Sequence, residues 1–275
     1  MSNTTADASD DGPVGVSTLL RQLLVQKFLL IVRYRVDFLG SIVGAYVFFA
    51  ILFFGGQAAV GSVGGGASAL GSTLDGFIVG WFLYTMAQAA YFSLASGVTQ
   101  ESEWGTFEQL YMSPYGFGTV MASKVVVNLV ESVFFGGLML VLMLVTTQRT
   151  LSVDLVTIAP VTLLALLSVV GLGFVFAGLA LVYKRIDSFS QLMQFAIIGL
   201  IAAPVAGFPP LRFLPLVQGS AMLQEAMRQG TRLWEFSTVE VGVLVGTAIV
   251  YSVAGYAVFR FCSRVARERG VMGHY

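Results

Sequence analysis

The chain has 275 residues, of which 56% are hydrophobic and 11% are charged, and its mean hydropathy is +0.83. A water-soluble domain carries about 25% charged residues, so this composition excludes a soluble globular protein and indicates a chain whose solvent is lipid. Fifteen basic and fifteen acidic residues give a formal net charge of zero, which excludes nucleic-acid binding by bulk charge, and the single cysteine excludes an internal disulfide.

Two different segments precede the first apolar run. Residues 1–16 are polar and acidic, which predicts a short disordered tail before a membrane domain over residues 17–275. Over residues 17–35 the polar side chains fall on one side of a helix and leucines cover most of the rest, with Lys27 as the exception. This pattern predicts an amphipathic helix that lies in the membrane interface. The alternative is that residues 17–35 form the ragged start of a long first span.

Six segments are apolar and long enough to cross a membrane as helices. The hydrocarbon core is about 30 Å thick and needs about 20 apolar residues, and each charge at its centre costs about 2.5–3.5 kcal/mol. The segments are residues 38–56, 76–98, 125–146, 155–183, 188–208 and 241–259. Only the third contains an Asp, Glu, Lys or Arg residue, which is Glu131. We therefore predict an all-α membrane protein with six transmembrane helices.

The basic residues predict how these helices are oriented, because Lys and Arg in short loops stay on the cytoplasmic side. Eleven of the fifteen precede the first span, follow the sixth, or lie in the loops after the second and fourth spans. Four lie on the opposite side. Both termini are therefore expected in the cytoplasm, with the chain in the cell membrane.

Glycines at helical spacing predict close contacts between helices. Gly171 to Gly178 is a glycine-rich run in the middle of an apolar span, where helices are expected to approach closely. Other glycines, spaced four apart, suit packing within the bundle, which we favour, or across a dimer. These pairs are Gly40/Gly44, Gly76/Gly80 and Gly242/Gly246.

The sequence has no pattern that is typical of an enzyme site. The only histidine is His274, which excludes a histidine-paired nucleophile in the membrane and a histidine metal cluster. A phosphate loop requires Gly immediately before Lys, and the three lysines follow Gln, Ser and Tyr. We therefore expect no catalytic residues, no metal site and no directly bound cofactor.

The loop between the second and third spans, residues 99–114, is the most informative polar segment. It carries three glutamates and a tryptophan, and its proline ends any helix. A short helix here would present Glu103 or Glu108 beside Phe107 and Leu110, a mixed acidic and apolar surface that suits a docking partner. From the residues alone, a solvated turn that keeps its acids out of the membrane is an equal alternative.

The string EWGTFEQLYMSP in this loop resembles the signature of type-two ATP-binding-cassette (ABC) exporter permeases. In that family a Glu, a Gly-Thr pair, a second Glu and a Leu precede a Ser-Pro or similar stop. The matching residues are Glu103, Gly105, Thr106, Glu108, Leu110, Ser113 and Pro114. The family commonly has a basic residue before the Gly and Leu after the Thr, where this chain has Trp104 and Phe107.

The likeness extends from about residue 17 to the end of the chain. In the family an interfacial helix precedes six spans, and a short external helical hairpin joins spans five and six. Here four prolines, Pro204, Pro209, Pro210 and Pro215, cluster at and after the end of the fifth span. The apolar piece 213–223 is too short to cross the membrane, so the hairpin is expected to be re-entrant.

The resemblance implies the membrane subunit of an exporter that works with partners. It implies a homodimer or heterodimer of such chains and two separately encoded ATPase subunits, which use ATP and Mg and push on the loop after span two. The residues expected to face the ATPase are Glu103, Gly105, Thr106, Phe107, Glu108 and Leu110, with Lys184, Arg185 and Asp187 as secondary contacts. A pathway with few charges suggests a lipophilic or amphipathic substrate, such as a drug, a lipid or a lipid-linked glycan.

A polar stripe follows in the third span. Lys124, Asn128 and Glu131 are spaced at i, i+4 and i+7, so they share one helix face. We expect Asn128 and Glu131 to line the substrate path or the dimer seam. The alternatives are an internal hydrogen bond to a neighbouring helix and a protonated Glu131.

Two other classes of function remain open from the sequence. One is a stand-alone six-helix channel or secondary transporter, which generally needs a charged or broken-helix site near the middle of the membrane. The other is a membrane scaffold without transport activity.

Overall fold

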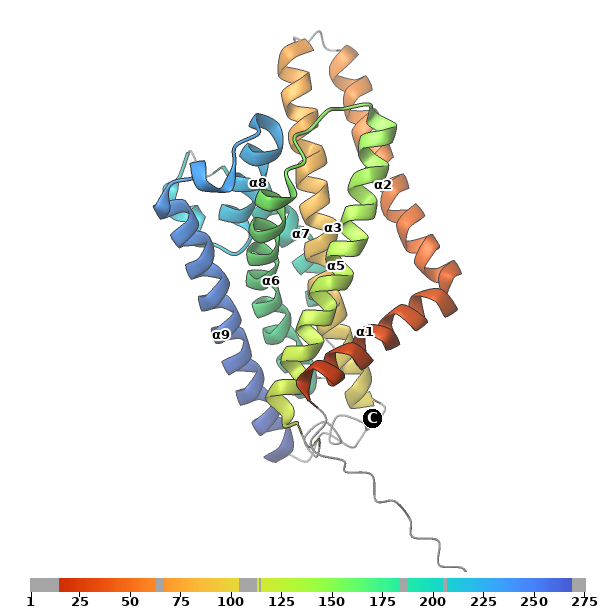
Figure 1. Ribbon diagram of the computed structural model, residues 1–275, viewed down its shortest axis with the longest axis vertical. Helices are drawn as coiled ribbons and strands as arrows, with labels where there is room; N and C mark the ends of the chain where they lie inside the picture. Colours follow the sequence, from red (N-terminus) through yellow and green to blue (C-terminus); the bar gives the residue numbers. More distant parts are fainter. Residues whose placement is uncertain are drawn as a thin grey trace, which may run out of the picture.

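The chain forms a bundle of α-helices (Figure 1), as the composition predicts. The computed structural model describes residues 15–62, 67–103, 113, 115–183, 187–204 and 207–268, and these contain no β-strand. The elements are α1 Val16–Arg33, α2 Arg35–Ser62, α3 Ala67–Glu103, α5 Phe117–Thr147, α6 Leu155–Tyr183, α7 Asp187–Ile201, η1 Pro209–Phe213, α8 Val217–Gln229, η2 Leu233–Glu235 and α9 Thr238–Glu268. The predicted tail lies outside the described residues except for its last two, and Val16 already begins α1.

Five of these helices are long and apolar enough to cross a membrane, namely α2, α3, α5, α6 and α9. Each contains one of the predicted spans, and α6 has the predicted bounds. The other predicted span, residues 188–208, forms the shorter helix α7, which has 15 residues and rises about 22 Å. It ends at Ile201 because Pro204 disfavours helical geometry in the residue before it.

Helix α1 is a separate element rather than the start of α2. The chain turns at Tyr34, whose φ of −103° and ψ of 38° break the helix. Figure 1 shows α1 running across the bundle toward α5, whereas α2 rises along the edge of the bundle. Residues 17–35 therefore do not continue α2 as one unbroken helix, and the interfacial position of α1 stays a prediction. We call the bend between α1 and α2 the elbow.

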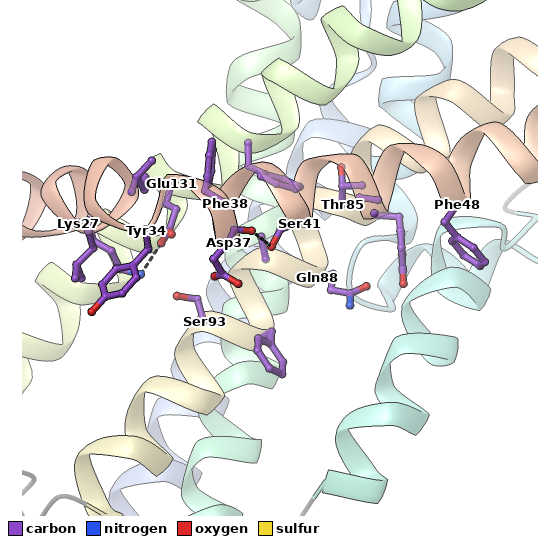
Figure 2. A pocket seen from close by; sticks show the side chains of 18 of the residues that line it. Lys27, Tyr34, Asp37, Phe38, Ser41, Phe48, Thr85, Gln88, Ser93 and Glu131 are labelled. Carbon is purple, nitrogen blue, oxygen red and sulfur yellow. Dashed lines mark hydrogen bonds and ion pairs between the residues drawn. The ribbon is translucent and has the colours of Figure 1, made fainter.

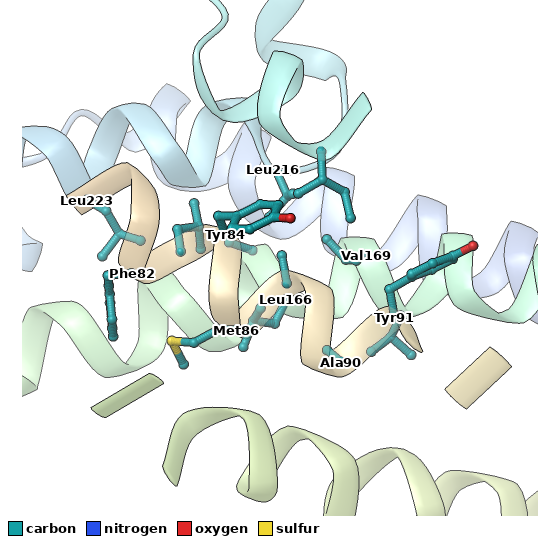
Figure 3. Packing of buried hydrophobic residues seen from close by; sticks show 14 of the residues in the cluster. Phe82, Tyr84, Met86, Ala90, Tyr91, Leu166, Val169, Leu216 and Leu223 are labelled. Atoms are coloured by element: carbon teal, nitrogen blue, oxygen red, sulfur yellow. The ribbon is translucent and has the colours of Figure 1, made fainter. Parts of the chain in front are cut away.

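The core of the bundle lies around α3 and α6, which are the most buried of the long helices. Both are apolar on several sides, so each can pack against several neighbours at once. Figure 3 shows Met86 and Ala90 of α3 beside Leu166 and Val169 of α6, with Leu223 of α8 closing one end. Helices α2 and α9 bury a few side chains in this core, such as Phe49 and Phe259, and expose many other large apolar side chains, as a surface in contact with lipid requires.

Helices α6 and α9 approach each other closely at glycines, as the run from Gly171 to Gly178 predicts. A Cβ added to Gly171 would overlap the carbonyl oxygen of Tyr251, and one added to Gly255 would overlap the backbone of Gly171. The buried Cys262 lies against Gly178 in the same contact. Small residues here let the two backbones come together.

The spaced glycine pairs behave differently from one another. Gly76 and Gly80 of α3 meet side chains of α8 and α7, so packing within the bundle is confirmed there. A Cβ on any glycine of the other two pairs would have no atom within 4 Å. Packing within the described bundle is therefore wrong for those pairs, and a contact across a dimer stays a prediction. They are Gly40/Gly44 in α2 and Gly242/Gly246 in α9.

A short helical unit joins α7 to α9 at the end of the bundle where α2 meets α3 (Figure 1). Its helix α8 begins four residues later than the predicted piece 213–223 and runs on to Gln229. Polar contacts hold it to the bundle: the Ser220 hydroxyl donates to the Ile201 carbonyl at 2.8 Å, and the Gln224 amide donates to the Gly76 carbonyl at 3.0 Å. The unit is thus docked on α3 and α7. Its depth in a membrane stays a prediction.

Candidate functional site

A cavity of about 740 Å³ lies inside the elbow (Figure 2). The cavity forms because the chain bends at Tyr34 and α1 crosses to α5. The contact between α1 and α5 keeps the elbow open, and α3 and α7 supply the other walls of the cavity. The polar side chains that line it come from α1, α2, α3, α5 and α7, and aromatic side chains line it between them. The polar residues include Lys27, Asp37, Gln88, Ser93, Glu131 and Gln194, and the rings include Tyr34, Phe38, Phe48, Trp81, Tyr84 and Phe92.

An ion pair between α1 and α5 closes one end of this cavity. The Lys27 ammonium lies 2.8 Å from a carboxylate oxygen of Glu131, and Figure 2 shows the two side chains joined. About a third of each side chain is exposed, so solvent weakens the attraction. Sequence reasoning missed Lys27 as the partner of Glu131. The signal was present, because Lys27 is the one charge on the otherwise apolar side of α1.

The polar stripe of α5 divides between two neighbouring helices. Lys124 forms an ion pair with Glu101 of α3, and the buried Asn128 accepts a hydrogen bond from the Ser93 hydroxyl at 3.1 Å. These two contacts match the alternative of internal bonds to a neighbouring helix. Glu131 alone lines the cavity, one turn further along α5. Whether any of the three contacts a substrate stays a prediction.

Asp37 is a second acidic group in the cavity, and it directly precedes the first predicted span, residues 38–56. It lies in the first turn of α2, where the helix dipole favours a negative charge. Its carboxylate has no ion-pair or hydrogen-bond partner among the residues that the structure describes. Asp37, Gln88 and Ser93 all line the cavity, and Figure 2 labels the three side chains. No pattern in the sequence marked Asp37, because the elbow brings it there.

The end of the cavity away from the ion pair is aromatic. Trp81 of α3 is 6% exposed, and its ring centroid lies 5.5 Å from that of Phe48 and 5.1 Å from that of Tyr84. The buried indole nitrogen of Trp81 has no hydrogen-bond partner within the described ranges. The Tyr84 hydroxyl shares a hydrogen bond with Gln194 of α7. The cavity is thus charged at one end and aromatic at the other, where Tyr84 and Gln194 also supply polar atoms.

Most of the expected ATPase-facing residues lie outside the described part of the chain. Helix α3 extends to Glu103, so the first five residues of the loop 99–114 continue the helix, and Glu101 is already held by Lys124. Glu103 and Asp187 are described only as the last residue of α3 and the first of α7. The others are Gly105, Thr106, Phe107, Glu108, Leu110, Lys184 and Arg185, and the structure does not describe them.

A smaller basic cavity of about 340 Å³ lies between the start of α5 and the end of α9. Arg260, Arg264 and Arg267 of α9 line it together with Gly118 of α5. In Figure 1 this end of the bundle also holds the end of α3, in agreement with the clustering of basic residues at one side of the spans.

Noncovalent binding is the chemistry that the elbow cavity supports. Its described lining offers hydrogen-bond donors and acceptors, three ionisable groups and several rings. Within the described residues no group of three or more His, Cys, Asp or Glu side chains could hold a metal ion. Comparison with models of protein families and with curated proteins found no match for this chain.

Proposed function

We propose that this chain is the transmembrane permease subunit of an ATP-driven ABC exporter. The elbow cavity is the observation that carries the transport role: it is large enough for a drug-sized molecule, and it lies among helices long and apolar enough to cross a membrane. The resemblance of residues 103–114 to the family signature supports the coupling to an ATPase. In this proposal the substrate is lipophilic or amphipathic, and the cavity is part of its pathway.

The proposal includes the arrangement in the membrane. Helices α2, α3, α5, α6 and α9 cross the cell membrane, and α7 with the segment after it forms the sixth, shorter crossing. Helix α1 lies in the cytoplasmic interface, and both termini are cytoplasmic. The unit that contains α8 is the external hairpin. The distribution of eleven basic residues against four supports this orientation.

The proposed mechanism requires partners. Two copies of the chain, identical or related, form the pathway, and two separate ATPase subunits bind the loops after α3 and α6. ATP and Mg act in those subunits. Their closure pushes the loop 104–112, and α3 and α5, which are tied together by the Lys124–Glu101 ion pair, would transmit that movement.

Copurification is the direct test of this proposal. The full chain, expressed with the genes that neighbour it and extracted in mild detergent, should bring down a soluble ATPase with a phosphate loop. Glu108→Lys should leave the protein in the membrane and abolish transport by the complex, because it places a positive charge at the expected contact. Glu268→Lys, the same charge change at the end of α9, is the control and should leave transport intact. Transport unchanged by Glu108→Lys would contradict the proposal.

A secondary transporter is the second candidate. The observation that favours it is that three ionisable side chains, Lys27, Asp37 and Glu131, line one cavity, because such groups mark ion and substrate sites in transporters. The chain alone in sealed vesicles distinguishes the two. Transport that follows an ion gradient without ATP would favour the secondary transporter, and transport that needs the ATPase would favour the exporter.

A further inference from the structure

We propose that the elbow cavity binds amphipathic organic cations, with Asp37 as the counter-ion and the aromatic end as the seat of the apolar part. The inference rests on the proposed transport function and deepens it by naming the class of substrate. The charges of the cavity, its rings and the spacing between its two ends support it.

The charges that line the cavity sum to about minus one. Among its described lining residues Lys27 is the only basic group, and Asp37 and Glu131 are the acidic ones. The Lys27 ammonium is already paired with Glu131 at 2.8 Å. Asp37 is left without a partner in the described chain. Asp37 is an exposed residue, so solvent screens its carboxylate until a cation with an apolar body enters beside it and displaces the water.

The aromatic rings favour the same class of ligand. The faces of Tyr, Trp and Phe rings attract a cation electrostatically, and recognition of quaternary ammonium groups by several rings is the common functional use of this attraction. Phe38 directly follows Asp37 and lines the cavity, so a ring stands near the charged end as well as the aromatic end, whereas the Tyr34 ring already has the Arg33 guanidinium 5.9 Å from its centroid. The rings also offer apolar area to an uncharged body.

The spacing of the two ends suits an amphipathic shape. From Asp37 to Phe48 is eleven residues along α2, which is about 16 Å of helix. A cationic head beside Asp37 would therefore place a drug-sized apolar body against Phe48 and Trp81. The volume of about 740 Å³ lies within the range of ligand sites for such molecules.

An anion fits the same cavity poorly. It would have to displace Glu131 from Lys27, and both carboxylates would then lack a positive partner among the described lining residues. Two uncompensated negative charges would oppose a third. The cavity therefore discriminates by charge, beyond its general preference for apolar molecules.

Two probes of the same shape and opposite charge test this proposal. The full chain in nanodiscs of zwitterionic lipid is titrated with tetraphenylphosphonium and with tetraphenylborate, and binding to empty nanodiscs is subtracted. The cation should bind saturably and at least about tenfold more tightly than the anion. Tenfold is about the effect of one attraction between unit charges about 6 Å apart in a site that keeps about half of its water. Equal or tighter specific binding of tetraphenylborate would overturn the proposal.

Variants at the two charged positions should move the affinity in opposite directions. Asp37→Asn should weaken tetraphenylphosphonium binding about tenfold, and Asp37→Glu should restore it. Lys27→Gln should tighten binding, because it frees Glu131. A merely structural effect would weaken binding in both cases. The control is Glu268→Gln, a carboxylate outside the cavity, which should change nothing.

The outcomes separate this proposal from the exporter assignment. If the cation binds as described and no ATPase copurifies with the chain, the cation site stands and the exporter assignment fails. If an ATPase copurifies and the cation does not bind, the cation site fails and the exporter assignment stands. An affinity unchanged by Asp37→Asn would remove Asp37 as the counter-ion and overturn the proposal as stated.

Discussion

Replacing Gly255 with alanine should loosen α9 from α6. The new Cβ would overlap the backbone of Gly171, which cannot move aside as a flexible side chain could. Overpacking of this kind costs about 1–3 kcal/mol. Alanine also favours a helix over glycine by up to about 1 kcal/mol, and this gain must be subtracted. A comparison with Gly246→Ala, in the same helix, removes that term, because a Cβ there has no atom within 4 Å.

The single cysteine reports the result without any added label site. Cys262 of α9 is 8% exposed and lies against Gly178 of α6, so a thiol-reactive fluorogenic maleimide reaches it when the two helices separate. A difference of about 2 kcal/mol between the two variants is a factor of about 25 in the opening equilibrium. We expect Gly255→Ala to be labelled faster than Gly246→Ala by about that factor in mild detergent. Equal labelling rates would refute the reasoning that backbone contact at these glycines holds the two helices together.

Two further predictions concern the cavity and its surroundings. Ser93→Ala should destabilise the chain by about 1–3 kcal/mol in thermal unfolding, because the buried Asn128 loses its hydrogen-bond donor. Ser96→Ala is the control. It removes only a hydrogen bond within its own helix and should change stability by less than about 0.5 kcal/mol. Lys27→Glu should speed trypsin cleavage at the arginines beside the elbow, because it breaks the ion pair with Glu131. Adding Glu131→Lys should slow the cleavage again, with a coupling energy of about 0.5–1 kcal/mol for a partly exposed pair. No recovery in the double variant would argue against the ion pair.

The elbow cavity links the fold to the proposed function because it depends on one break in the chain. If residues 17–35 had continued α2, Lys27 would lie far from Glu131 and the rings of α2 and α3 would enclose no space beside them. The break at Tyr34 turns the apolar side of α1, with Lys27 as its single basic residue, into a wall of the cavity. We therefore expect that, among substitutions in α1, those at Lys27 change the cavity most.

The sequence by itself determined the class of fold and much of its layout. The cost of placing charge in lipid acts on each segment locally, so apolar runs identify the five long helices, and α6 has the bounds that its run predicts. Helix ends were less well predicted. Helix α5 begins eight residues before the run 125–146, because a helix can extend past the lipid into water, and an apolar run marks only the lipid part. The glycines from Gly171 to Gly178 also predicted a close helix contact on α6, but the sequence did not identify α9 as the partner.

Only the tertiary structure decided which polar groups meet. The spacing of Lys124, Asn128 and Glu131 placed them on one face of α5, but two of them bond to α3 and the third to α1. That division depends on the angles at which α1 and α3 cross α5, which local sequence does not encode. The same holds for Asp37, which became a cavity residue through the turn at Tyr34. Helix formation follows from neighbours in the chain, whereas a binding site follows from how helices pack.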